Sequence, residues 1–253
     1  MSIFLAALLG LIVGSFLNVC IYRIPRRENI VFPPSHCPNC RQPIKPYDNI
    51  PLLSYLLLRG RCRGCGGRIP LRYPVVEAAA GVGFAAIVGR YGINSSSLLY
   101  LIFFSVLLVL AFIDLEHQIL PDVITLPGIP LGLLLGLLLP QARFLSSALG
   151  LLLGGMLFYL VAFLSRGGMG GGDIKLAAMI GSFLGWQKLV LTIFLASVSG
   201  SVVGAMMVAL RLKGRKGEEV DTAIPFGPFL ALGATLSLLW GGRLIEWYGR
   251  LLH

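Results

Sequence analysis

The sequence has few charged residues: Asp, Glu, Lys and Arg make up 13% of its 253 residues, whereas 56% are hydrophobic. Soluble globular domains carry about 25% charged residues, and the mean hydropathy of +0.84 departs from that class in the same direction. An ordinary soluble domain is therefore excluded. The sequence also lacks ten-residue segments in which apolar and polar residues alternate, and this excludes a membrane β-barrel.

Several catalytic and ligand-binding motifs are absent as well. The three histidines do not form a zinc-protease motif, and no serine-based triad is apparent. There is no complete G-x-x-x-x-G-K-[ST] motif and no glycine-rich strand-to-helix fingerprint. These absences argue against serine and zinc peptidases and against a P-loop phosphate site, and the missing strand-to-helix fingerprint leaves no soluble methyltransferase sheet.

Long apolar segments are what the sequence has in abundance. Eight of them approach or exceed the length needed to cross a hydrocarbon core of about 30 Å. They cover residues 2–22, 73–89, 97–114, 122–140, 144–164, 173–186, 189–210 and 224–240. The runs are continuous and Leu-rich, which favours helices, and GLIVG at 10–14 is typical of close helix packing. We predict an all-α polytopic membrane protein with about eight transmembrane helices, the short sixth one tilted, broken or partly re-entrant.

Basic residues outnumber acidic ones by 21 to 11, and their placement indicates an orientation in the membrane. With eight crossings, 16 of the Lys and Arg residues fall on the side of the 23–72 loop and 5 on the other side. By the positive-inside rule, this loop is cytoplasmic and both termini lie outside. The basic excess suits contact with anionic lipids, and no feature demands nucleic acid.

Paired cysteines occur in the loop between the first two apolar segments. CPNCRQPI at 37–44 and CRGCGGRI at 62–69 form a weak internal repeat, in which Ile follows the second Cys by four residues. Four thiolates from two C-x-x-C units suit a closed tetrahedral zinc site, whereas a cytoplasmic loop disfavours persistent disulfides. We predict a structural Zn²⁺ bound by Cys37, Cys40, Cys62 and Cys65.

A redox or disulfide role for these cysteines is the alternative interpretation. His36 either competes as a ligand or is a surface histidine, and Cys20 is interpreted as a packing residue of the first helix. The predicted domains are a first transmembrane helix at 1–22, a cytoplasmic zinc-binding insert at 23–72 and a multi-helix membrane core at 73–253.

Two aspartates stand where apolar helices meet water: Asp114 in FIDLEHQILPD and Asp173 in RGGMGGGDIKL. A carboxylate inside or at the edge of a bilayer costs at least about 2.5 kcal/mol, which indicates a chemical use. The predicted topology places both at similar depth on the cytoplasmic side, so they can converge. Two close carboxylates do not both ionise easily, and we predict that one keeps a proton while the other acts as a base toward water.

Other polar residues near these aspartates keep two interpretations. Asp122 follows Pro121 and either caps the fourth helix or takes part in catalysis. Glu116 and His117 are either solvated interface residues or substrate contacts, and Glu77 either satisfies a neighbouring helix or lines a polar pocket.

The glycine-rich run at 165–173 is predicted to bend the chain and present Asp173 at a helix start. A phosphate-binding loop and a helix-capping role for Asp173 are the rival interpretations. An aspartate at this place would repel phosphate.

Taken together, several motifs resemble those of the bacterial type IV prepilin peptidases. They are GSFLNVCIYRIPRR at 14–27, the paired cysteines, RYPVVE at 72–77, DLEHQILPD at 114–122, GGGDIKL at 170–176 and AIPFGPFLALG at 223–233. The resemblance spans nearly the whole chain in order. GGGD also fits the G-x-G-D signature of intramembrane aspartyl proteases, with Gly170, Gly172 and Asp173 in its fixed places.

The resemblance implies cleavage of type IV prepilins or type II secretion pseudopilins after a leader glycine, at the cytoplasmic side of the bacterial inner membrane. It also implies N-methylation of the new N-terminal residue with S-adenosylmethionine as donor. Asp114 and Asp173 fall on the family's catalytic aspartates. No donor-binding residue is assigned, although the cytoplasmic loop and the ends of the first three helices can form its walls.

Two other functions compete with this interpretation. A proton-coupled membrane transporter would use the same intramembrane carboxylates and would move cargo without cleaving a peptide. A noncatalytic assembly scaffold stabilised by zinc would need neither aspartate.

Overall fold

The computed structural model describes residues 1–138, 144–165, 170–213 and 225–251. Residues 166–169, part of the predicted glycine-rich turn, lie outside these ranges. The chain forms two compact units, Met1–Ile113 and Asp114–His253. The described residues form helices and two isolated β-bridges but no β-strand, which confirms the predicted all-α class.

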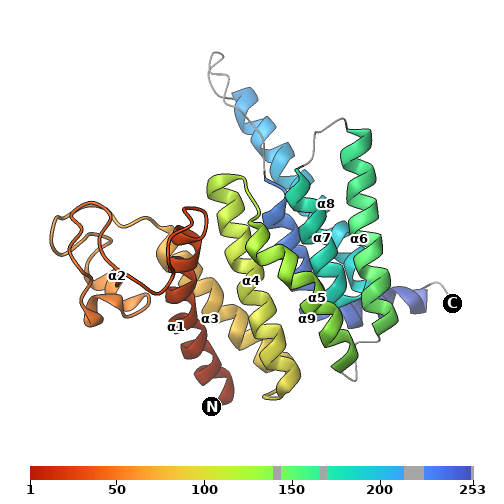
Figure 1. Cartoon of the computed structure of the whole chain (residues 1–253), viewed down its shortest axis with the longest axis horizontal. Helices are drawn as coiled ribbons and strands as arrows, with labels where there is room; N and C mark the ends of the chain where they lie inside the picture. The colour runs from red at the N-terminus through yellow and green to blue at the C-terminus, as the bar shows by residue number, and fades with distance from the viewer. Residues whose placement is uncertain (139–143, 166–169, 214–224, 252–253) are drawn as a thin grey trace. The chain divides into compact units, whose positions relative to one another are not determined.

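Each predicted apolar segment corresponds to one helix in the described ranges (Figure 1). The helices are α1 (Ser2–Arg23), α3 (Arg72–Tyr91), α4 (Ser95–His117), α5 (Asp122–Leu138), α6 (Phe144–Leu164), α7 (Gly171–Leu184), α8 (Trp186–Lys213) and α9 (Gly227–Leu251). By length and composition, five of them can cross a membrane: α1, α4, α6, α8 and α9. The most apolar 18-residue part of α8 has a mean hydropathy of 2.1, yet only 6% of it is buried within the protein. Such an exposed apolar surface suits lipid, and the chain is a multi-pass membrane protein.

In the first unit, α1 packs closely against α3 because both helices carry small residues. A Cβ atom on Gly14 would come within 2.8 Å of the Glu77 Cα, and one on Gly10 within 2.8 Å of the Gly81 Cα. The predicted packing role of GLIVG is therefore confirmed. Between these helices, the chain forms the short elements η1 (Pro46–Asn49) and α2 (Leu53–Leu57), which the sequence did not predict.

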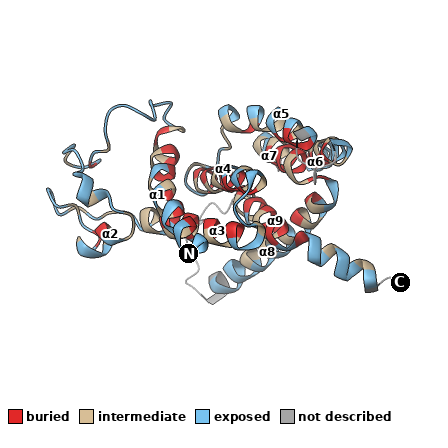
Figure 2. Ribbon diagram, turned by 90° about the horizontal axis from the view of Figure 1, so that it is seen from below, coloured by how far each residue is buried: buried red, intermediate tan, exposed pale blue. Residues whose placement is uncertain are grey.

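In the second unit, α7 is the central helix. It packs against α5, α6, α8 and α9, and its residues from Leu176 to Ser182 are buried. The contact with α6 is main chain against main chain, because a Cβ atom on Gly150 or Gly181 would collide with the backbone of the other helix. Figure 2 shows buried residues gathered where α5, α6 and α7 lie together. This packing holds the start of α7 in place.

Candidate functional site

Asp114 lies in the last turn of α4 and is only 6% exposed. Its Oδ2 accepts a hydrogen bond of 3.0 Å from the backbone N–H of Gly227, the first residue of α9. The first N–H groups of a helix have no partner within the helix, so a carboxylate there satisfies one of them. A Cβ atom at position 227 would lie 2.5 Å from that same oxygen. The main chain of α9 therefore orients Asp114, and glycine is the residue that permits the approach.

Asp173 lies in the first turn of α7, as the glycine-rich motif predicted. Gly170 precedes the helix in an extended conformation, and its carbonyl accepts the Asp173 N–H at 3.1 Å. Gly172 has no room for a side chain, because a Cβ atom there would come within 2.8 Å of the Leu120 Cβ. Gly172 therefore serves close approach, and none of the glycines at 170–172 has a positive φ.

The two aspartates are within electrostatic range of each other, since the charge of Asp114 acts on Asp173. Both belong to the second unit. Two neighbouring carboxylates that are partly removed from water can exchange protons with a bound water molecule. The arrangement has the groups required for acid–base hydrolysis, and the catalytic role of the pair remains a prediction.

The other polar residues of this region differ in their surroundings. Asp122 begins α5, and its carboxylate accepts a hydrogen bond of 2.6 Å from Lys175 Nζ on α7. Glu116 is exposed. His117 is half-buried, and its Nε2 is fully buried without a hydrogen-bond partner among the described residues. Asp122 thus ties the starts of α5 and α7 together.

The cysteines of the first unit lie in two hairpins that repeat each other bond for bond. In the first, the Cys37 N–H donates to Gln42 and the Arg41 N–H donates to Cys37. In the second, the Cys62 N–H donates to Gly67 and the Gly66 N–H donates to Cys62. The residues with positive φ also correspond, Arg41 at 56° and Gly66 at 67°. The weak sequence repeat is therefore a repeat of structure.

Four sulfur atoms converge where the hairpins meet. The Sγ atoms of Cys37, Cys40, Cys62 and Cys65 all lie within 4.8 Å of one another, and those of Cys37 and Cys65 are 3.9 Å apart. A tetrahedron of sulfur atoms about 2.3 Å from a zinc ion has edges of about 3.8 Å. The cluster can hold a metal ion with little rearrangement.

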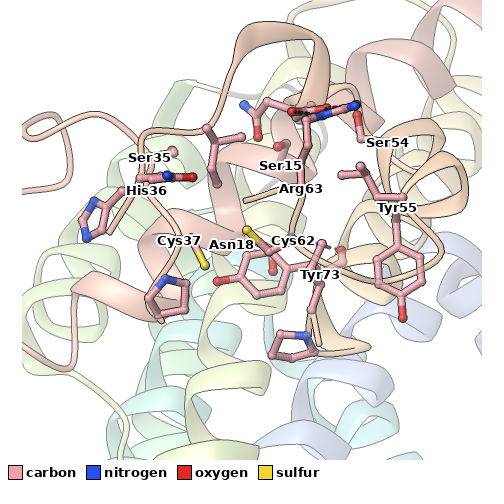
Figure 3. A pocket seen from close by; sticks show the side chains of 18 of the residues that line it. Ser15, Asn18, Ser35, His36, Cys37, Ser54, Tyr55, Cys62, Arg63 and Tyr73 are labelled. Carbon is pink, nitrogen blue, oxygen red and sulfur yellow. Dashed lines mark hydrogen bonds and ion pairs between the residues drawn. The ribbon is translucent and has the colours of Figure 1, made fainter. Parts of the chain in front are cut away.

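The surroundings of the cluster act in opposite directions on two of its thiols. Backbone N–H groups of Cys65 and Gly64 lower the pKa of Cys62 to about 7, which brings its thiolate within reach at neutral pH. The Gln42 backbone lowers the pKa of Cys40, but burial and the other three cysteines outweigh it and raise this pKa to about 11. His36 is exposed, its Nδ1 is 3.1 Å from the Pro34 carbonyl oxygen, and its ring points away from Cys37 and Cys62 (Figure 3). Cys20 is buried on α1, in keeping with a packing role.

Comparison with known proteins connects both sites to one family. Residues 8–91 match the bacterial peptidase A24 N-terminal domain, and residues 101–205 match the type IV leader peptidase family. The chain belongs to the type IV leader peptidase family. Relatives named prepilin leader peptidase/N-methyltransferase are 37% identical in Pseudomonas putida and 39% identical in Pseudomonas aeruginosa, each over 95% of this chain and 91% of the relative. A relative of the same name in Myxococcus xanthus is 43% identical over 84% of this chain and 64% of its own length.

No solved structure matches the chain. The predicted family is confirmed, together with the predicted peptidase and methyltransferase classes. None of these matches favours the proton-coupled transporter.

In this member of the type IV leader peptidase family, the structure identifies three residues near the two sites that the sequence analysis did not single out. Gly227 orients Asp114, Lys175 pairs with Asp122, and Asn18 is a buried polar residue within apolar α1. Asn18 alone had a sequence signal, because a lone amide in a membrane helix is costly and suggests a use. The other two contacts join residues that are distant in sequence.

Proposed function

We propose that this protein cleaves the leader peptides of type IV prepilins or type II secretion pseudopilins, with Asp114 and Asp173 as its catalytic pair. The observation that carries the proposal is the placement of two carboxylates in one compact unit at the ends of apolar helices, one of them fixed by a backbone N–H. Family membership supports the reaction class. A substrate with a long apolar helix can stay in lipid while its scissile bond reaches these helix ends.

The chemistry follows from two carboxyl groups in opposite protonation states. The ionised carboxylate removes a proton from water as the water oxygen attacks the scissile carbonyl carbon. The protonated carboxyl group then gives its proton to the departing nitrogen as the C–N bond breaks. No covalent acyl-enzyme forms, and one water molecule is consumed for each bond cleaved.

We also propose that the same protein methylates the new N-terminus with S-adenosylmethionine as donor. The names of the relatives support this second reaction. The amine lone pair forms the N–C bond while the S–C bond breaks and its electrons pass to sulfur. The sulfonium becomes a thioether, and the nitrogen releases one proton.

The remaining parts of the proposal concern location and the metal. The protein lies in the bacterial inner membrane with the aspartates facing the cytoplasm, a placement supported by the basic excess around the 23–72 loop. Residues 23–72 form the zinc-binding insert, 1–22 the first transmembrane helix and 73–253 the membrane core. Cys37, Cys40, Cys62 and Cys65 would hold a structural Zn²⁺ that organises the insert.

Mass spectrometry of a prepilin incubated with the purified protein tests both reactions. Without S-adenosylmethionine, the expected product is the mature chain, and with it the product is heavier by one methyl group. An intact prepilin in both reactions would refute the peptidase proposal. A mature chain of unchanged mass in the presence of the donor would refute methylation alone.

A further inference from the structure

A cavity of about 380 Å³ lies in the first unit, lined by α1, α3 and the cysteine-bearing insert. Its volume falls within the range of about 300–1,000 Å³ typical of small-molecule sites. Asn18 and Tyr73 line it from the helices, and Cys37 and Cys62 from the hairpins (Figure 3). The cavity therefore adjoins the metal cluster and extends beyond it to the helices.

Asn18 presents an unsatisfied acceptor in this cavity. Its side chain is 1% exposed, and its Nδ2 donates to the backbone oxygens of Tyr73 at 3.1 Å and Gly14 at 3.3 Å. These two bonds fix which way the amide points. Its Oδ1 is buried and has no hydrogen-bond partner among the described residues. A buried acceptor without a partner costs free energy, and a ligand that donates to it or is cationic removes that cost.

Glu77 adds a negative charge to the same lining. It is 8% exposed, and its Oε2 accepts the backbone N–H of Leu52 at 2.8 Å. Ser15 also faces this carboxylate. The close approach of α1 at Gly14 brings Asn18 and Glu77 into one cavity. An amide oxygen and a carboxylate together favour a positively charged ligand.

Arg23 gives the cavity a positive group as well. It is 6% exposed, and its guanidinium donates to two main-chain carbonyls, those of Asn29 at 2.9 Å and Pro33 at 2.6 Å. Both of these carbonyl partners are neutral, so the charge of Arg23 can attract a carboxylate. Tyr73 supplies an aromatic ring in the lining that can contact a flat heterocycle. The lining thus suits a ligand with a cation, a carboxylate and an aromatic base.

We propose that this cavity is the binding site of the methyl donor, S-adenosylmethionine, with Asn18 and Glu77 recognising its positive charge and Arg23 its carboxylate. The inference rests on the proposed methyltransferase function and adds the residues that bind the donor. The donor supplies the methyl group, and this chain supplies recognition of the donor. The four cysteines retain their separate role as a metal site.

Isothermal titration calorimetry on the full-length protein with bound zinc tests the site through its charge preference. The two probes are S-adenosylmethionine, a sulfonium, and S-adenosylhomocysteine, its neutral thioether. Glu77→Gln removes one charge and keeps the shape, so affinity for the sulfonium should fall at least about tenfold and affinity for the thioether less than about threefold. Glu28→Gln makes the same chemical change at an exposed position outside the cavity and should leave both affinities unchanged.

The outcomes separate this inference from the proposed function. Equal loss for both probes, or no loss for either, in a Glu77→Gln protein that retains its zinc would overturn the site. If the wild-type protein bound neither probe, the proposal that S-adenosylmethionine is the donor would fail, and the proposed site would fail with it.

Photo-cross-linking of the wild-type protein to radiolabelled S-adenosylmethionine covers the case in which the Glu77 variant misfolds. Label is expected on peptides within residues 15–77. Label confined to residues 114–251 would contradict the proposal.

Discussion

The two candidate sites of this chain are held in shape by different forces. Asp173 stands at the start of α7, which small residues bring into backbone contact with α6, and Asp114 is held by the backbone N–H of Gly227. The cysteine hairpins have no such support. Between residues 24 and 71, Cys37 is the only buried hydrophobic residue, whereas α7 alone has seven consecutive buried positions.

This difference indicates which site depends on a ligand for its structure. A segment without a hydrophobic core cannot offset its loss of conformational entropy and needs another source of stability. In the insert, that source is the metal proposed at the four cysteines. The aspartates need no ligand, because burial of the helices around them supplies the stability.

The largest effect is expected at the aspartates. Asp114→Asn or Asp173→Asn removes one proton-transfer group, and cleavage should fall at least about 100-fold. Because the two act as one unit, the double variant should be little slower than either single variant. Prepilin cleavage followed by mass spectrometry measures this, with circular dichroism as the control for folding. A single variant that keeps more than a tenth of the wild-type rate would exclude that residue from catalysis.

Loss of the metal should affect the insert and spare the helices of the second unit. In Cys62→Ser, zinc content measured by elemental analysis should fall, and limited proteolysis should cut within residues 24–71. Metal binding requires deprotonated thiols, so zinc should also be lost as the pH is lowered. Cys20→Ser, on α1 outside the cluster, is the matched control. If the metal-free insert resisted protease as well as the wild type does, the metal would have no structural role.

A smaller effect is expected when Asp114 is displaced but kept. Gly227→Ala places a methyl group 2.5 Å from the Asp114 Oδ2, so the carboxylate must move. A misplacement of this size should lower kcat about tenfold or more with little change in KM. Gly242→Ala on the same helix is the control, because a Cβ atom there has no heavy atom within 4 Å. Equal rates for the two variants would mean that the Gly227 contact does not position the catalytic group.

The smallest effect is expected in the first hairpin. Arg41 has a φ of 56°, where the second hairpin has glycine, so Arg41→Gly relieves backbone strain. Glycine also makes the unfolded chain more flexible, and the net gain in stability should be below about 1 kcal/mol. Thermal unfolding of the zinc-bound protein measures it. Arg61→Gly, at a position without positive φ, should lower stability and serves as the comparison.

The helices could be predicted because membrane thickness imposes a length on apolar runs, which the sequence displays directly. The cysteine repeat could be predicted for a similar reason, since each hairpin is built from neighbouring residues. Gly227 could not be found this way. It meets Asp114 across 113 residues, and the Lys175 contact with Asp122 spans 53. Contacts over such distances depend on how helices pack, which local patterns do not record. The short elements η1 and α2 in the Pro- and Arg-rich insert could not be predicted either, because they show no apolar periodicity.

The length of α7 has a consequence for how water and substrate meet. Its 14 residues extend for about 21 Å, about 9 Å less than a typical hydrocarbon core. Where the start of such a short helix borders lipid, the bilayer would accommodate the hydrophobic mismatch by thinning. Thinning beside the start of α7 would bring bulk water to the level of Asp173 without drawing a substrate helix out of lipid. We therefore expect peptidase activity in liposomes to depend on acyl-chain length, with longer lipids slowing cleavage.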